Sequence, residues 1–503
     1  MYSRSSGVLI PIISLPGKFG IGDMGKEAFE FVDFLHDTRQ QLWHILPINP
    51  TGKDNSPYNC ISAFAGNILF ISPEKLLEDG LLEETDIKFL IQKNPGAAIN
   101  YHEIRLLKKN MLRKAYLNFI ADFEKRKEPY FTFLGKNAWW LNDYTLFKSI
   151  KEEKGYNLCW NKWEDKIKHH DSHNIDVAIL HFSKEIEFRR FVQYIFFKQW
   201  TELKTYANNR GIKIICDMPL YVPLDCADVW SNQDMFLLDR EGEKKWIGID
   251  TNGKFRESPL YDWNRIKERN FDWWLSRFHF NFEMFDIIRI NHFRKFKSFW
   301  AVPAGEDTTK KVCLMKANGE ELLEKLEKEL GTLPIIAEDV KSDLAEVEKL
   351  RERFNIPGIK ILQQAFLSDE KNSFLPHNYP LNSVVYTATQ NNNTNIGWLK
   401  NMSSTEQENV RSYYSSGWIH LHKKVIETAW ASVARMAIVP MQDILELDSR
   451  ARMNTPGVSE RSWQWRFDMR MLKKKQWKLL RTMTKKYNRQ RKKEDKQKMT
   501  KNE

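Results

Sequence analysis

Short runs of apolar and β-branched residues recur along the chain, and each ends abruptly in polar residues. Such runs predict buried strands. Eight of them stand out: Gly7–Ile12, Leu42–Ile48, Ile212–Tyr221, Phe285–Phe293, Pro334–Val340, Gly358–Gln364, Ser383–Thr389 and Met436–Leu445. Between most of these runs, apolar residues three and four positions apart predict amphipathic helices, as at Glu27–His36, Glu320–Leu330 and Leu344–Phe354.

Eight strands that alternate with helices predict an α/β fold, a (β/α)₈ TIM barrel. Continuous apolar strands fit this fold, because parallel strands are covered on both faces. Periodicity alone leaves a doubly wound open sheet as an alternative. Residues from about 73 to 206 are mostly helical in pattern and separate the second and third strands without a Gly/Ser linker. We therefore expect one barrel domain at 1–470 with a large helical insertion.

Composition narrows the class of protein. Of 503 residues, 42% are hydrophobic and 29% are charged, which is typical of a folded soluble protein and excludes collagen-like, mucin-like and disordered chains. Aromatic residues make up 13% and suit sugar stacking as well as core packing. Five widely spaced cysteines without a CxxC pair favour reduced thiols over disulfides or a zinc site. With neither a signal peptide nor an 18-residue apolar run, we expect a cytoplasmic protein without a membrane span.

The net charge of +12 is concentrated at one end of the chain. Residues 471–503 hold 14 Lys or Arg against three Asp or Glu, so the first 470 residues are nearly neutral. We expect a basic helix near Leu472–Tyr487 and, beyond about Tyr487, a solvated tail that is mobile and dispensable for folding. A nucleic-acid binder is the alternative that this charge raises, but the neutral body offers it no recognition surface.

Polar residues close several of the predicted strands, where a barrel places its active site. Acidic, amide and basic groups gathered there resemble a carbohydrate site. For Asp339 and Asp443 a structural role is the better interpretation. Glu338 is different, because a carboxylate that ends an Ile-Ile-Ala strand is costly to bury without a purpose. The residues are Asp217, Arg289, Asn291, His292, Glu338, Asp339, Gln390, Asn391 and Asp443.

Eight specific strings occur in order along the chain: SGVLIPIISLPGKFGIGD at Ser6–Asp23, SPYNCISAFAGN at Ser56–Asn67, DMPLYV at Asp217–Val222, PLYDW at Pro259–Trp263, RINHFRKF at Arg289–Phe296, IIAEDV at Ile335–Val340, PHNYP at Pro376–Pro380 and ARMNTPG at Ala451–Gly457. Through them the sequence, from Ser5 to about Phe467, resembles the 4-α-glucanotransferases (amylomaltases) of glycoside hydrolase family 77. The resemblance implies retaining transfer of α-1,4-glucan chains between maltooligosaccharides, with no cofactor and no metal. It leaves the oligomeric state open.

The resemblance also assigns roles to residues. The acid/base is Glu338, but the position of the nucleophile holds Asn291 and that of the transition-state stabiliser holds Asn391, where the family has aspartates. Gln390 stands where the family has histidine. The loop before PLYDW is shortened, with Arg256 about where a tryptophan is expected. The residues expected to bind the glucan are Ser56, Tyr58, Asp217, Arg289, His292, Gln390 and Asn454.

These departures bear directly on the chemistry. An amide lacks the negative charge of a carboxylate, and loss of such a nucleophile costs on the order of 10⁵–10⁶ in turnover. Several positions and a loop differ together, unlike a single engineered exchange. Two functions remain: a glucanotransferase with weak or absent turnover, and a non-catalytic glucan-binding or regulatory protein.

Overall fold

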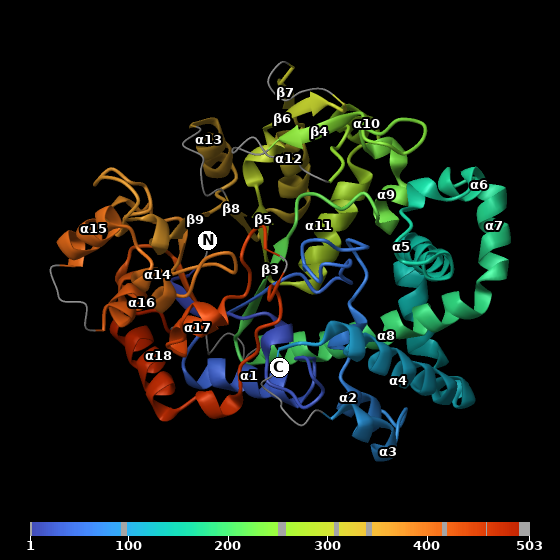
Figure 1. Cartoon of the computed structure of the whole chain (residues 1–503), viewed down its shortest axis with the longest axis horizontal. Coiled ribbons are helices and arrows are strands. Elements are labelled where there is room, and N and C mark those ends of the chain that lie inside the picture. The colour runs from blue at the N-terminus through green and yellow to red at the C-terminus, as the bar shows by residue number, and fades with distance from the viewer. Residues whose placement is uncertain are drawn as a thin grey trace.

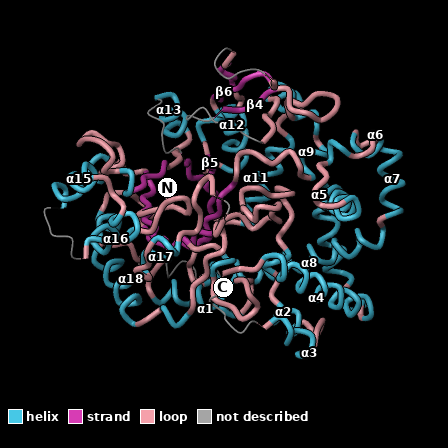
Figure 2. The backbone as a smooth tube through the Cα atoms, in the orientation of Figure 1, coloured by secondary structure: helices cyan, strands magenta, loops and turns pink. Residues whose placement is uncertain are grey.

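The computed structural model describes residues 3–91, 98–249, 258–305, 311–338, 345–414, 420–458 and 460–491. Eight parallel strands close into a barrel in the order β1-β11-β10-β9-β8-β5-β3-β2, at the centre of the molecule (Figure 2). This confirms the predicted (β/α)₈ barrel over the open sheet. The strands are β1 Ser5–Leu9, β2 Leu42–Ile45, β3 Lys213–Met218, β5 Ile287–Asn291, β8 Ile335–Glu338, β9 Gly358–Ile361, β10 Ser383–Tyr386 and β11 Met436–Pro440.

Seven of the eight predicted runs contain one barrel strand each, and Gly7–Ile12 overlaps β1, which begins two residues earlier at Ser5. Each strand ends before its apolar run does. After β9, for example, Leu362–Gln364 continues the apolar run as a 3₁₀ turn. Side chains on the inner face are mainly branched and aliphatic, and they form a separate buried cluster with Tyr386. The barrel is therefore filled below its mouth, as this fold requires.

Helices surround the barrel (Figure 1). None in the described part of the chain is long and apolar enough to cross a membrane. Their bounds are α1 Lys26–Asp37, α2 Pro73–Glu78, α3 Glu84–Ile87, α4 Tyr101–Ala121, α5 Lys127–Lys154, α6 Asp165–Lys168, α7 Ser172–His181, α8 Ser183–Asn209, α9 Ala227–Ser231, α10 Trp263–Glu268, α11 Asp272–Met284, α12 Gly319–Leu330, α13 Ala345–Arg353, α14 Asn395–Lys400, α15 Ser404–Tyr414, α16 Leu421–Ala431, α17 Met441–Ile444 and α18 Lys474–Lys486.

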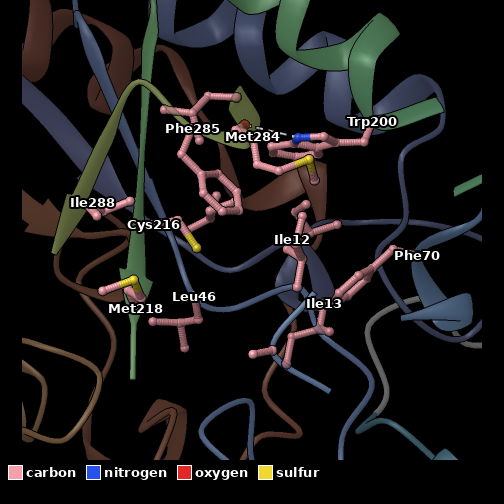
Figure 3. Close-up of a cluster of buried hydrophobic side chains, with 14 of the residues drawn as sticks. Ile12, Ile13, Leu46, Phe70, Trp200, Cys216, Met218, Met284, Phe285 and Ile288 are labelled. Atoms are coloured by element: carbon pink, nitrogen blue, oxygen red, sulfur yellow. Dashed lines mark hydrogen bonds between the residues drawn. The ribbon is translucent and has the colours of Figure 1, made fainter. Parts of the chain in front are cut away.

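Helices α2 to α8 all lie between β2 and β3 in the chain, and Figure 1 shows α4 to α8 gathered on one side of the molecule. Helix α8 joins them to the barrel. The indole of Trp200 on α8 donates a hydrogen bond of 3.1 Å to the carbonyl of Met284, beside Phe285, Cys216 and Ile288 (Figure 3). The helical block and the outer face of β3 and β5 thus share one hydrophobic core.

A small antiparallel sheet adds a feature that the apolar pattern does not predict. It has the order β4-β6-β7, formed by Trp246–Ile249, Ser298–Pro303 and Cys313–Lys316. Strand β7 is largely exposed, so it lacks the continuous apolar run that marks a barrel strand.

The basic helix is present as α18, but the expectation of a mobile, solvated tail beyond about Tyr487 is wrong at Arg489. This guanidinium is fully buried. It donates hydrogen bonds to the carbonyls of Trp430 at 2.8 Å, Ser5 at 3.0 Å and Ala434 at 3.0 Å. The carbonyls at the end of α16 have no partner within their helix and carry partial negative charge, so they attract a cation.

We expect Arg489→Ala to lower the melting temperature by several degrees, because it removes several hydrogen bonds from a buried guanidinium, and hydrogen bonds to charged groups contribute about 1.5–3 kcal/mol. Deletion of Asn488–Glu503 should have a similar effect, because it removes the same contacts. The matched control is Lys485→Ala, an exposed cation on α18. Thermal unfolding, followed by circular dichroism, gives the melting temperature of each variant. Equal melting temperatures for the wild type and Arg489→Ala would contradict the role assigned to Arg489.

Candidate active site

A buried ion pair lies at the mouth of the barrel. Asp217 and Arg289 are paired residues on the neighbouring strands β3 and β5, and neither side chain is exposed. The guanidinium donates to both carboxylate oxygens, at 2.6 and 2.5 Å. Burial raises the pKa of Asp217, but Arg289 and His44 together hold that pKa below its usual value. The pair is therefore charged in the folded protein.

Two residues that the sequence interpretation missed support this pair. His44 on β2 contacts Asp217 Oδ1 through Nε2 at 2.9 Å, and its Nδ1 lies 3.1 Å from the hydroxyl of Tyr386 on β10. Burial and the nearby Arg289 lower the pKa of His44. Since a carboxylate only accepts, the neutral imidazole donates from Nε2, and Tyr386 donates to Nδ1. The signal was a histidine inside the buried strand Leu-Trp-His-Ile.

Tyr58 and Gln390 extend the network toward the opening. The Tyr58 hydroxyl donates to Asp217 Oδ2 at 2.5 Å and accepts from Gln390 Nε2 at 2.6 Å. The oxygen of Gln390 accepts from Arg289 at 3.1 Å. Burial and then Asp217 raise the pKa of Tyr58 well above its ordinary value, so the hydroxyl stays protonated. Ser56 lies beside this group, and its hydroxyl accepts from the Tyr58 amide at 3.3 Å.

Asn291 and Glu338 are also paired across neighbouring strands, β5 and β8. The Asn291 amide nitrogen donates to Glu338 Oε2, which lies 3.8 Å from Arg289 Nη2. Burial raises the pKa of Glu338, while Arg289 and the Asn291 hydrogen bond act in the opposite direction. Asn291 Oδ1 and Arg289 Nη1 are buried and have no hydrogen-bond partner among the described residues.

Asn391 and Asn454 contact each other at the outer edge of the mouth, which we call the rim. Asn454 Nδ2 donates to Asn391 Oδ1 at 2.7 Å, and Arg452 donates to the Asn391 carbonyl at 3.1 Å. Gln390, next in the chain, joins this exposed edge to the buried network. His292 follows Asn291 directly, with φ at 56°, and is exposed. Asp339 and the shortened loop with Arg256 lie outside the described residues.

A family model described as 4-alpha-glucanotransferase matches residues 10–473. The chain belongs to the 4-alpha-glucanotransferases of glycoside hydrolase family 77. The family acts on α-glucans.

Individual members agree over nearly the whole chain. The 4-alpha-glucanotransferase of Synechocystis is 41% identical, covering 92% of this chain and 94% of the relative. That of Thermus thermophilus is 36% identical over the same shares. Among solved structures, an amylomaltase from Streptococcus agalactiae in complex with acarbose matches with a TM-score of 0.92 and 33% identity, covering 97% of this chain and all of the other.

Asp443 has structural contacts. Its carboxylate accepts from the Thr387 hydroxyl at 3.0 Å and from the backbone amide of Asn395, at the start of α14, at 2.7 Å. Burial raises its pKa to about 7. In the described part of the chain, no cluster of three or more His, Cys, Asp or Glu residues could hold a metal ion.

Asp443 predicts a pH dependence of stability. Because its pKa is higher in the folded state, its contribution is fully present below about pH 4 and is lost as the pH rises through about 7. The amide introduced by Asp443→Asn cannot ionise. We therefore expect the melting temperature of the wild type, relative to this variant, to fall between pH 5 and pH 8. If the difference in melting temperature between the wild type and Asp443→Asn stays constant across that range, this prediction is wrong. The control is Asp176→Asn, which changes an exposed aspartate.

Proposed function

We propose that the chain binds α-1,4-glucans, such as maltooligosaccharides, at the mouth of its barrel, with glucan transfer absent or slower by several orders of magnitude than a complete catalytic set allows. One observation carries this proposal. At the position where a nucleophilic carboxylate is expected, the amide of Asn291 donates a hydrogen bond to Glu338. The expected acid/base thus faces a neutral donor instead of an anion.

Retaining transfer needs two carboxyl groups about 5–5.5 Å apart. One attacks the anomeric carbon and forms a covalent glucosyl intermediate, and the other protonates the leaving oxygen. A second sugar then attacks the intermediate and regenerates the free nucleophile. The amide oxygen of Asn291 carries no charge and is a poor nucleophile. The first step therefore lacks its attacking group.

The missing anion also affects Glu338. A neighbouring carboxylate normally raises the pKa of the acid and keeps it protonated until it donates. The N–H of Asn291 instead stabilises the ionised form of Glu338. Burial remains as the principal influence that raises its pKa.

The transition state is also poorly stabilised. Positive charge develops on the sugar ring as the glycosidic bond breaks, and a properly placed anion lowers the energy of that state. Asn391 provides a neutral amide at the expected position and is already bonded to Asn454. Nucleophile, acid and stabiliser are therefore all affected.

Binding depends on groups that are retained. Hydroxyl, amide and guanidinium groups bond to sugar hydroxyls without any need for the lost charges. Arg289 Nη1 and Asn291 Oδ1 offer a buried donor and a buried acceptor without a partner among the described residues. Such groups favour a ligand that satisfies them. The acarbose complex of the Streptococcus agalactiae relative supports a sugar ligand of this kind.

The catalytic test uses maltotriose. We expect the wild type to convert maltotriose neither to glucose nor to oligosaccharides of greater length at a normal enzymatic rate. Asn291→Asp alone should stay inactive, because Asn391 and Gln390 still leave the transition state unsupported. The triple variant Asn291→Asp, Asn391→Asp, Gln390→His should recover measurable disproportionation. Chromatography of the products measures this reaction. Normal turnover by the wild type that Glu338→Gln abolishes would refute the catalytic part of the proposal.

The binding test uses calorimetry and thermal shift with maltoheptaose. We expect millimolar affinity or better in the wild type and binding several-fold weaker in Arg289→Ala. Asn454→Ala tests the rim without breaking the buried ion pair and should also weaken binding. Asn382→Ala, a partly exposed asparagine just before β10, is the matched control and should bind as the wild type does. Absence of both heat and thermal shift at millimolar ligand would refute the binding part.

A further inference from the structure

A hollow lies outside the network of the mouth, between α5, α9 and α11. Its volume is about 190 Å³, and the loop Ser62–Phe64 forms part of its wall. Trp139, Trp273, Asp143 and Asp272 line it, together with Asn232 and Ser276. None of these residues takes part in the hydrogen bonds around Arg289 and Asp217. We refer to it as the α5–α11 pocket.

We propose that the α5–α11 pocket binds a single glucose unit of an α-glucan, as a site separate from the mouth. This inference rests on the proposed function, because the ligand class comes from there. A pocket of this volume lies below the roughly 300–1,000 Å³ of pockets that enclose drug-sized ligands. It therefore has room for one sugar ring at the end or side of a chain, and not for a run of several.

Trp139 provides the aromatic wall. Its indole packs edge-on against Phe64, with ring centroids 4.6 Å apart, and also lies near Phe280. Nearly half of the residue, 48%, is nevertheless exposed. An aromatic ring that neighbours already hold loses little conformational entropy when a ligand packs on it. The C–H groups of a pyranose ring form an apolar face that suits such a surface.

The polar wall is held in place by Arg269. Its Nη2 donates to Asp272 Oδ2 at 3.0 Å and to Asn232 Oδ1 at 3.3 Å. Its Nη1 donates to Asp234 Oδ1 at 2.9 Å. The carboxylate of Asp143 lies 3.4 Å from His170 Nε2. Carboxylate and amide groups oriented in this way bind hydroxyls at a small entropic cost.

A buried donor supplies an independent observation. Trp273 is only 7% exposed, and its indole N–H has no hydrogen-bond partner among the described residues. An unsatisfied buried N–H costs about 1–3 kcal/mol. Trp273 lines the α5–α11 pocket, so a sugar hydroxyl bound there is a candidate partner for this N–H, which an aliphatic ligand is not.

The indole N–H signals of Trp139 and Trp273 in ¹⁵N NMR spectra of the full chain test this inference. They are assigned with Trp139→Phe and Trp273→Phe, and maltose is the probe. We expect the Trp273 signal to shift and saturate as maltose is added. Trp139→Ala should bind at this pocket roughly tenfold more weakly, because it loses the stacked face. Phe131→Ala, which removes a similarly exposed aromatic on α5, should behave as the wild type.

Failure of this inference and failure of the proposed function give different results. If the Trp273 signal does not move at maltose concentrations that saturate the mouth, or if Trp139→Ala leaves the affinity at the pocket unchanged, the pocket is not a sugar site. In Asn454→Ala the Trp273 shift should persist with unchanged affinity, because that variant alters only the mouth. A Trp273 shift that saturates while the mouth binds no maltooligosaccharide would refute the proposed function alone.

Discussion

The buried pair of Arg289 and Asp217 is the interaction on which the mouth of the barrel depends. Removing two charges from water costs several kcal/mol per ion, and only good geometry with further hydrogen bonds offsets that cost. Here the bonding is bidentate, and His44 and Tyr58 fill the remaining positions around the carboxylate. Side chains from three neighbouring strands and one loop are thereby fixed in one arrangement. That arrangement does not depend on a charge at residue 291 or 391.

This independence explains how the hydrogen-bond network forms with neutral amides at residues 291 and 390. Asn291 and Gln390 are neutral but still bond to Glu338, Arg289 and Tyr58. An amide has nearly the shape of a carboxylate and can donate as well as accept. It fits beside a charged neighbour without the repulsion that a second carboxylate would bring. The mouth therefore folds around its ion pair whichever of the two groups, amide or carboxylate, stands at residue 291.

Most of the fold could be predicted because a buried parallel strand leaves a local pattern. All eight barrel strands have one, as does α12, whereas the exposed strand β7 does not. Arg489 shows the limit of this approach. A basic residue near a charged terminus has the pattern of a solvated tail, and only the fold reveals that carbonyls of α16 and β1 converge on it.

The residues of the site also differ in how far the sequence alone could reveal them. Glu338, Asn291 and Asp217 close their strands and so could be named from the sequence. His44 lies inside its strand and not at the end, so the sequence marks it only as a buried histidine, and its partners Asp217 and Tyr386 lie 173 and 342 residues away. The α5–α11 pocket joins residues of three helices, none of which has an unusual pattern by itself. Contacts between distant segments leave no local signal, so only the assembled structure shows them.

Closure of the barrel sets a condition on biosynthesis. Strand β1 pairs with β11, and Arg489 donates to the carbonyl of Ser5 across 484 positions of sequence. At about 5–20 residues per second, the ribosome needs roughly 25–100 s to make the residues between them. Throughout that time the edge of β1 that β11 will cover is an open template for pairing with other chains. Strands in the middle of the sequence meet their partners far sooner, so the seam between the first and last strands is the point of the nascent protein most exposed to misassembly.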